Sequence, residues 1–141
     1  MAGKESSDSL CKDLAVLVID DEPIVGRTLR LALGKIGCRI ESFTDPAEAL
    51  ERIDEKDFNI VITDVVMGDI DGIQVLEHVM KRNPECKVII MTAFAMMELA
   101  RKAMDKGAFD FIAKPFDSEE IREIVRKTAR AIRSTDMKES E

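Results

Sequence analysis

The chain has 141 residues, close to the size of one ordinary domain, and 45% of them are hydrophobic while 35% are charged. That composition is typical of a folded globular domain and argues against a disordered chain. Acidic side chains outnumber basic ones by 28 to 21, for a net charge of −7. This excess argues against a general attraction to nucleic acid or anionic lipid.

The three cysteines, Cys11, Cys38 and Cys86, are widely spaced, and the single histidine, His78, has no cysteine near it in the sequence. This spacing does not match a zinc site, and we interpret the cysteines as reduced thiols in the cytoplasm. The apolar runs are far shorter than the about 20 residues of a membrane span, and no signal peptide pattern is present. A cytoplasmic protein without a membrane contact is expected.

Residues 1–12 and 134–141 are polar and mixed in charge. We expect a flexible N-terminal arm, a domain over 13–133, and a flexible C-terminal tail or the start of a linker. Within the domain, short apolar runs with many β-branched residues predict strands buried on both faces. They lie at 14–19, 38–43, 58–63, 87–91 and 109–113.

Amphipathic segments alternate with these strands. Apolar residues repeat at helical spacing over 25–36, and Gly37 is suited to end that helix. Asp45-Pro46-Ala47-Glu48 and Asp117-Ser118-Glu119-Glu120 resemble helix N-termini, and further helices are expected over 72–82 and 95–106. Five strands alternating with five helices predict an α/β fold, a doubly wound parallel sheet with helices on both faces.

Polar side chains stand where the expected strands end: Asp20 and Asp21 after the first, Asp64 after the third, Thr92 after the fourth and Lys114 after the fifth. In open parallel sheets, functional sites form at the carboxyl ends of the strands. If the first and third strands are neighbours, the three carboxylates lie close together. Taken singly, each of these residues has a plain structural alternative as a helix cap or a loop residue, but their occurrence at successive strand ends favours a site.

Close carboxylates repel each other, by about 4 kcal/mol for one pair at about 4 Å and an effective dielectric constant near 20. A hard divalent cation such as Mg²⁺ relieves this repulsion and also binds phosphate oxygens. A carboxylate beside the cation can attack phosphorus. The Lys114 amine and the Thr92 hydroxyl are suited to stabilise a bound phosphoryl group.

With these motifs in this order, the sequence resembles the receiver domains of two-component response regulators. The resemblance covers about residues 13–133. It implies a flavodoxin-like five-stranded sheet with strand order 2-1-3-4-5. The segments that carry it are 16–23 (Val-Leu-Val-Ile-Asp-Asp-Glu-Pro), Asp64 with Met67-Gly-Asp-Ile-Asp-Gly72, Met91-Thr92-Ala93, Gly107-Ala108 and Lys114-Pro115-Phe116.

The resemblance also implies roles for single residues. Asp64 is the expected phosphoacceptor. Asp20, Asp21, Asp64 and the backbone carbonyl of Val66 are the expected Mg²⁺ ligands. Thr92 is expected to bind the phosphoryl group and to move toward it.

Two further positions complete this implied set. Phe111 occupies the aromatic switch position and is expected to turn inward as Thr92 shifts. Lys114 is expected to pair with the phosphoryl group through its amine, and its peptide bond to Pro115 is expected to be cis.

By the same resemblance, the chain is a phosphoacceptor switch and not an enzyme acting on external substrates. A sensor histidine kinase or a phosphotransfer protein is the expected donor. The face made by the fourth helix (95–106), the fifth strand (109–113) and the fifth helix would contact an output domain, a protein partner or a second copy. Met96, Met97 and Leu99 lie on that fourth helix and serve either the core or such a contact.

The sequence departs from the family pattern in the loop after Asp64, where Met67-Gly68 stands in place of Met-Pro. In addition, the residues two positions beyond Asp64 and Thr92 are both apolar, Val66 and Phe94. Our hypothesis is that these two side chains leave the attacking water poorly oriented, so that the phosphoprotein is long-lived.

Two alternatives belong to other classes. A Mg²⁺-dependent phosphohydrolase would use a similar aspartate, but such enzymes need a second acid two residues later, where this chain has Val66. A degenerate receiver that only docks to partners is disfavoured by the intact set of Asp21, Asp64, Thr92 and Lys114.

Overall fold

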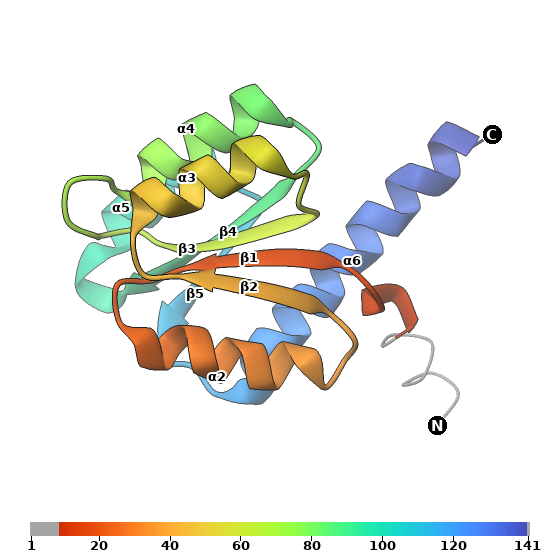
Figure 1. Ribbon diagram of the computed structural model, residues 1–141, viewed down its shortest axis with the longest axis horizontal. Helices are drawn as coiled ribbons and strands as arrows, with labels where there is room; N and C mark the ends of the chain where they lie inside the picture. The colour runs from red at the N-terminus through yellow and green to blue at the C-terminus, as the bar shows by residue number, and fades with distance from the viewer. Residues whose placement is uncertain (1–8, 141) are drawn as a thin grey trace.

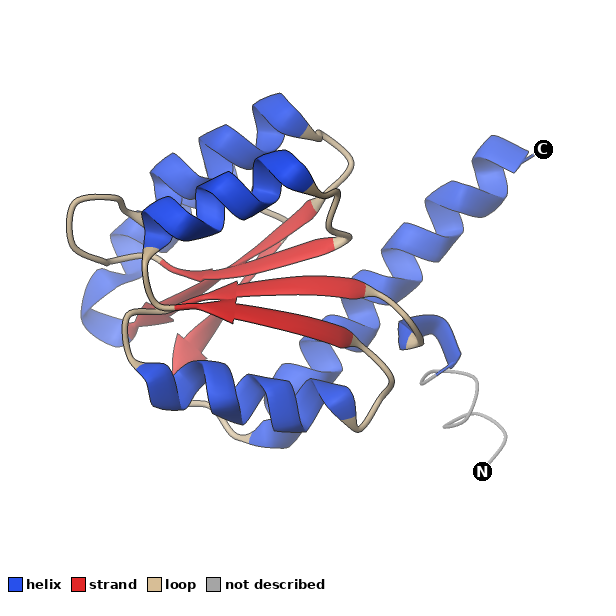
Figure 2. Ribbon diagram, in the orientation of Figure 1, coloured by secondary structure: helices blue, strands red, loops and turns tan. Residues whose placement is uncertain are grey.

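The computed structural model of the chain describes residues 9–140. Five parallel strands form one sheet in the order β2-β1-β3-β4-β5 (labelled in Figure 1 and red in Figure 2). This topology confirms the predicted doubly wound sheet and its strand order. The strands are β1 (Ala15–Ile19), β2 (Arg39–Phe43), β3 (Ile60–Asp64), β4 (Lys87–Ala93) and β5 (Asp110–Lys114).

Helices cover both faces of the sheet (Figure 1). α2 and α6 pack on one face, and α3, α4 and α5 pack on the other. A short 3-10 turn, η1 (Phe94–Met96), precedes α5. The helices are α2 (Pro23–Gly34), α3 (Pro46–Glu55), α4 (Gly72–Arg82), α5 (Met97–Asp105) and α6 (Ser118–Ser140).

The buried strands divide the core into two hydrophobic clusters. Because successive strand side chains point to opposite faces, Val16 and Val18 of β1 join the cluster under α2 and α6. Leu17 and Ile19 join the cluster under α3, α4 and α5. This alternation explains why β1, β3 and β4 read as continuous apolar runs, since both of their faces are covered. The edge strands β2 and β5, also expected to be buried on both faces, are only partly buried, because each has a neighbouring strand on one side alone.

Side-chain caps fix where three helices begin, next to the carboxyl edge of the sheet. The Asp45 carboxylate accepts the Ala47 N–H at 3.0 Å, and Asp117 accepts the Glu120 N–H at 2.8 Å, as their sequence patterns predict. Asp71 accepts the Gln74 N–H at 2.8 Å, and the Gln74 side chain returns a hydrogen bond to the Asp71 N–H at 2.9 Å. The loop that follows β3 is therefore held at the start of α4.

Both ends of the domain differ from the sequence-based expectation. Residues 1–8 of the expected arm lie outside the described part of the chain, but residues 9–11 are helical, and Leu10 and Cys11 pack against the α2–α6 cluster. At the other end, residues 134–140, expected as a flexible tail, continue α6 as helix to Ser140 (Figure 1). Neither Gly nor Pro occurs in 118–140, so nothing in the backbone interrupts this helix.

Candidate functional site

The register of the sheet brings the expected site residues to one edge. Asp20 directly follows β1, and Asp64 ends the neighbouring strand β3. Thr92 lies near the end of β4, and Lys114 ends β5 beside it. The carboxyl ends of the neighbouring strands β1, β3, β4 and β5 therefore present these side chains in one row.

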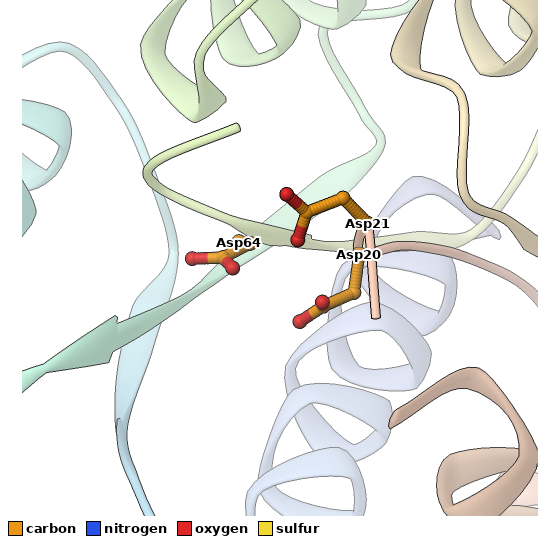
Figure 3. Close-up of side chains that lie close together, drawn as sticks. All are labelled: Asp20, Asp21 and Asp64. Carbon is orange, nitrogen blue, oxygen red and sulfur yellow. The ribbon is translucent and has the colours of Figure 1, made fainter. Parts of the chain in front are cut away.

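Three carboxyl groups gather at this edge. Oxygen atoms of Asp20, Asp21 and Asp64 all lie within 4.8 Å of one another, and Figure 3 shows the three side chains close together at the ends of β1 and β3. Asp20 is buried, Asp64 is half-buried and Asp21 is exposed. Three hard oxygen donors that open to solvent at one side match the chemistry of a Mg²⁺ site.

Lys114 bridges two of these carboxylates. Its amine donates to Asp20 Oδ2 at 2.6 Å and to Asp64 Oδ2 at 3.1 Å. One ammonium group faces three carboxylates, so the cluster keeps an excess of negative charge. A divalent cation is suited to balance that excess.

Backbone groups hold the other oxygen of each bridged carboxylate. The Glu22 N–H donates to Asp20 Oδ1 at 2.9 Å, and the Val66 N–H donates to Asp64 Oδ1 at 3.3 Å. These donors fix the orientation of both side chains. The sequence analysis did not foresee them, because backbone donors leave no signal in residue types.

The environment shifts the ionisation of Asp64 and Lys114. Burial raises the pKa of Asp64, the charge and hydrogen bond of Lys114 oppose the shift, and the net result is a raised pKa. For Lys114, burial acts to lower the pKa, but hydrogen bonds and charge from Asp20 and Asp64 outweigh it and the pKa rises. The Lys114 amine therefore remains cationic near neutral pH. It lies beside the Asp64 carboxylate, whose charged form is destabilised by the burial of Asp64.

Thr92 on β4 and Phe111 on β5 are the two expected switch residues. Thr92 is fully buried, and its hydroxyl lies 3.1 Å from the Ala93 carbonyl oxygen and 3.2 Å from that of Met96. The Thr92 side chain is thus directed at η1. Phe111 is half-buried and packs against the α3–α4–α5 cluster, and the Lys114–Pro115 peptide bond is cis, as the resemblance implied.

Comparison with known proteins identifies the family. The model of the response regulator receiver domain matches residues 16–126. The chain belongs to the response regulator receiver domain family. It is thus a receiver domain of the kind that works in two-component signalling.

Relatives with known names agree with this assignment. The receiver domain is 32% identical over 124 residues to the response regulator protein PilR of Pseudomonas aeruginosa, covering 88% of this chain and 28% of that protein. It is 35% identical over 112 residues to the DNA-binding transcriptional regulator NtrC of Escherichia coli K12, covering 79% of this chain and 24% of that protein. The chain therefore spans about a quarter of the length of these curated relatives.

A solved structure agrees as well. The crystal structure of a response regulator receiver domain protein from Clostridium thermocellum superimposes with a TM-score of 0.79 at 28% identity, covering 88% of this chain and 98% of that one. Within residues 9–140, no helix of this receiver domain is both long enough and apolar enough to cross a membrane.

Proposed function

We propose that this receiver domain is a switch controlled by phosphorylation of Asp64 in the presence of Mg²⁺. The observation that carries the proposal is the clustering of Asp64 with Asp20 and Asp21 beneath the bridging amine of Lys114. A carboxylate nucleophile, a set of oxygen ligands and a fixed cation are the groups that phosphoryl transfer to an aspartate requires.

The acidic cluster would hold the metal ion. Asp20, Asp21 and Asp64 would supply carboxylate oxygens, and the Val66 carbonyl a backbone oxygen. When bound, Mg²⁺ supplies charge neutralisation between the acceptor and the phosphoryl oxygens. The Lys114 amine pairs with one oxygen of Asp20 and one oxygen of Asp64. The metal ion and the amine would therefore both neutralise the negative charge of these two side chains.

The residues of this chain then have distinct roles in the transfer. An Asp64 carboxylate oxygen attacks phosphorus and forms an acyl phosphate while the donor's leaving group departs. Lys114 pairs with an oxygen of the transferred group, since its amine is already 3.1 Å from Asp64 Oδ2. Thr92 turns its hydroxyl from η1 to another phosphoryl oxygen.

That rotation would carry the signal. Thr92 stops donating to the Met96 carbonyl, so η1 and the start of α5 lose this hydrogen bond. Phe111 on β5 then moves inward. The affected surface is the α5–β5–α6 face, on which Met96 is exposed while Leu99 packs into the core. This face would contact an output domain, a protein partner or a second copy, and a sensor histidine kinase or phosphotransfer protein in the cytoplasm would be the donor.

Hydrolysis of external phosphate esters is a weaker alternative. Turnover by an aspartyl-phosphate route needs an acid-base group beside the nucleophile. Two residues after Asp64, the side chain is that of Val66, which is 47% exposed and offers no such group.

The proposal is tested by intact-mass measurement after incubation with Mg²⁺ and acetyl phosphate. The expected result is one phosphoryl adduct, reduced to background when EDTA removes the metal, since the acidic cluster then repels the incoming anion. If no adduct forms, beryllofluoride should still perturb the NMR signals of residues near Asp64. A protein that responds to neither reagent would be a docking module that only retains the site.

Val66 and Phe94, the residues two positions beyond Asp64 and Thr92 and here called the apolar rim, give a second prediction, on the lifetime of the phosphoryl group. Val66 is 47% exposed and Phe94 is 81% exposed, and neither side chain has a polar group that could orient a water molecule. Val66→Asn and Phe94→Glu are each expected to speed loss of the adduct by about tenfold, less than a well-positioned acid-base group achieves. The decay of the adduct mass with time measures this rate.

The matched control is Leu31→Asn on α2, where the side chain is also exposed, at 73%. The control is expected to leave the decay rate unchanged. If both rim variants decay at the wild-type rate, the apolar rim does not set the lifetime.

A further inference from the structure

The first described residues dock at the edge of the sheet opposite the acidic cluster. They precede β1, whereas the acidic cluster follows it. The Asp13 N–H donates to the Gly37 carbonyl at 2.9 Å. A Cβ added to Gly37 would lie 3.1 Å from the Lys12 Cα, so the two backbones are in close contact. The segment 9–13 is thus packed on the loop that joins α2 to β2.

Two cysteines flank this contact. Cys11 precedes Lys12 and is 0% exposed, while Cys38 follows Gly37 and is 8% exposed. Both belong to the hydrophobic cluster under α2 and α6. The neighbouring Cys11 side chain and burial both raise the pKa of the Cys38 thiol. Cys11 and Cys38 thus flank one close backbone contact and share one buried cluster.

We propose that Cys11 and Cys38 form an oxidation site, at which hydrogen peroxide converts the two thiols to a disulfide. The Cys38 thiolate attacks one peroxide oxygen, the O–O bond breaks, and Cys38 becomes a sulfenic acid while hydroxide leaves. The Cys11 thiolate then attacks the Cys38 sulfur, the S–O bond breaks, and hydroxide leaves again. Both hydroxides take up the thiol protons, so two thiols are oxidised and one peroxide is reduced to two waters.

Opening of the segment 9–13 controls this reaction. The thiolate is the reactive form, and the raised pKa of Cys38 keeps that thiol protonated while the segment is docked. On α6, Arg133 donates to the Leu10 carbonyl at 3.2 Å and to the Lys12 carbonyl at 3.4 Å. Because the docked segment spans residues 9–13 alone, we expect it to detach locally, without global unfolding. Detachment exposes both cysteines, and redocking brings them together to form the bond.

The third cysteine provides an internal control. Cys86 is also buried, but it lies in the other hydrophobic cluster, under α3, α4 and α5. The sheet therefore separates it from Cys11 and Cys38. A reaction that depends on contact between neighbouring thiols will not involve Cys86.

The test is to treat the protein with hydrogen peroxide, block unreacted thiols with N-ethylmaleimide and measure the intact mass. Wild type is expected to lose two hydrogen atoms and to bind one maleimide after denaturation, and peptide mapping should join Cys11 to Cys38. The thermal midpoint should rise by about 10 °C and return with dithiothreitol, since the bond cross-links residues 11 and 38 in the unfolded chain. Asp64→Asn should behave identically, which separates this proposal from the proposed function.

The variants give opposite expectations. Cys86→Ser should form the same disulfide, whereas Cys11→Ser and Cys38→Ser should not. Peptide mapping of the oxidised wild-type protein tests the proposal without any variant. The test therefore holds even where a cysteine variant fails to fold. A disulfide that includes Cys86, oxygen added to Cys38 without a link to Cys11, or an unchanged mass would each overturn the proposal.

Discussion

Replacing Asp64 with asparagine is expected to abolish the phosphoryl adduct, to below about 1% of the wild-type amount after incubation with acetyl phosphate and Mg²⁺. The amide has no anionic oxygen to attack phosphorus and is a weaker metal ligand. Asparagine keeps the size of the side chain and can still accept the Val66 N–H, which donates to Asp64 Oδ1 at 3.3 Å. Intact mass with and without the substitution measures the effect directly.

The same substitution should leave the fold intact. Burial raises the pKa of Asp64, and the charge of Asp20 adds to the shift, so removing the Asp64 charge relieves a penalty. We expect the free energy of unfolding to change by less than about 1 kcal/mol. Asp69→Asn, an exposed change in the same loop, is the matched control and should be phosphorylated like wild type. An adduct of normal size on Asp64→Asn would show that another residue is the acceptor.

Much of the candidate site follows from the sequence because a parallel sheet converts order along the chain into position in space. Asp20, Asp64 and Lys114 each stand where an apolar run ends, and their strands β1, β3 and β5 have carboxyl ends at one edge. The hydrogen bonds of Lys114 to both aspartates then need only ordinary side-chain reach. Local pattern sufficed here because the geometry of the fold is regular.

The orientation of Thr92 could not be read in the same way. Its hydroxyl lies 3.2 Å from the carbonyl oxygen of Met96, the last residue of η1. The sequence pattern did not predict this 3-10 turn. The expected helix began at residue 95, whereas α5 begins at Met97, after an N-cap residue without a side-chain cap. Without Ser, Thr, Asp or Asn at that position, the sequence carries no start signal.

Long-range contacts explain the other differences. Residues 1–12 are polar as a group, yet Leu10 and Cys11 pack into the core, and Arg133 on α6 donates to the Leu10 and Lys12 carbonyls. His78 on α4 pairs with Asp54 on α3 at 2.8 Å, a contact that local sequence does not indicate. Each partner is more than 20 positions away in the chain, beyond the reach of periodicity.

Gly72 is a further residue whose importance appears only in three dimensions, and it sets the last prediction. A Cβ at this position would lie 2.6 Å from the Asp64 carbonyl oxygen and 2.8 Å from the Val65 Cα. Both atoms belong to the backbone, so neither can move aside as a side chain would. Gly72 therefore allows the start of α4 to approach the end of β3, and its N–H donates to the Val65 carbonyl at 2.9 Å.

Gly72→Ala is accordingly expected to lower the free energy of unfolding by about 2–3 kcal/mol, the upper part of the usual range for overpacking a tight contact. Because the strain falls on the backbone of Asp64, the rate of phosphorylation should also fall. Urea unfolding followed by circular dichroism gives the stability, since the chain has no Trp or Tyr to report it by fluorescence. Intact mass against time gives the rate.

Gly68→Ala is the matched control in the same loop, because a Cβ there would meet nothing within 4 Å. Its stability should lie within about 0.5 kcal/mol of wild type. If Gly72→Ala is as stable as Gly68→Ala, the start of α4 can move away from β3 without loss of stability. Close packing of α4 against β3 then does not position the acceptor. If Gly72→Ala loses stability but is phosphorylated at the wild-type rate, the contact stabilises the fold alone. The expected loss of both would show that one glycine couples the packing of α4 to the placement of Asp64.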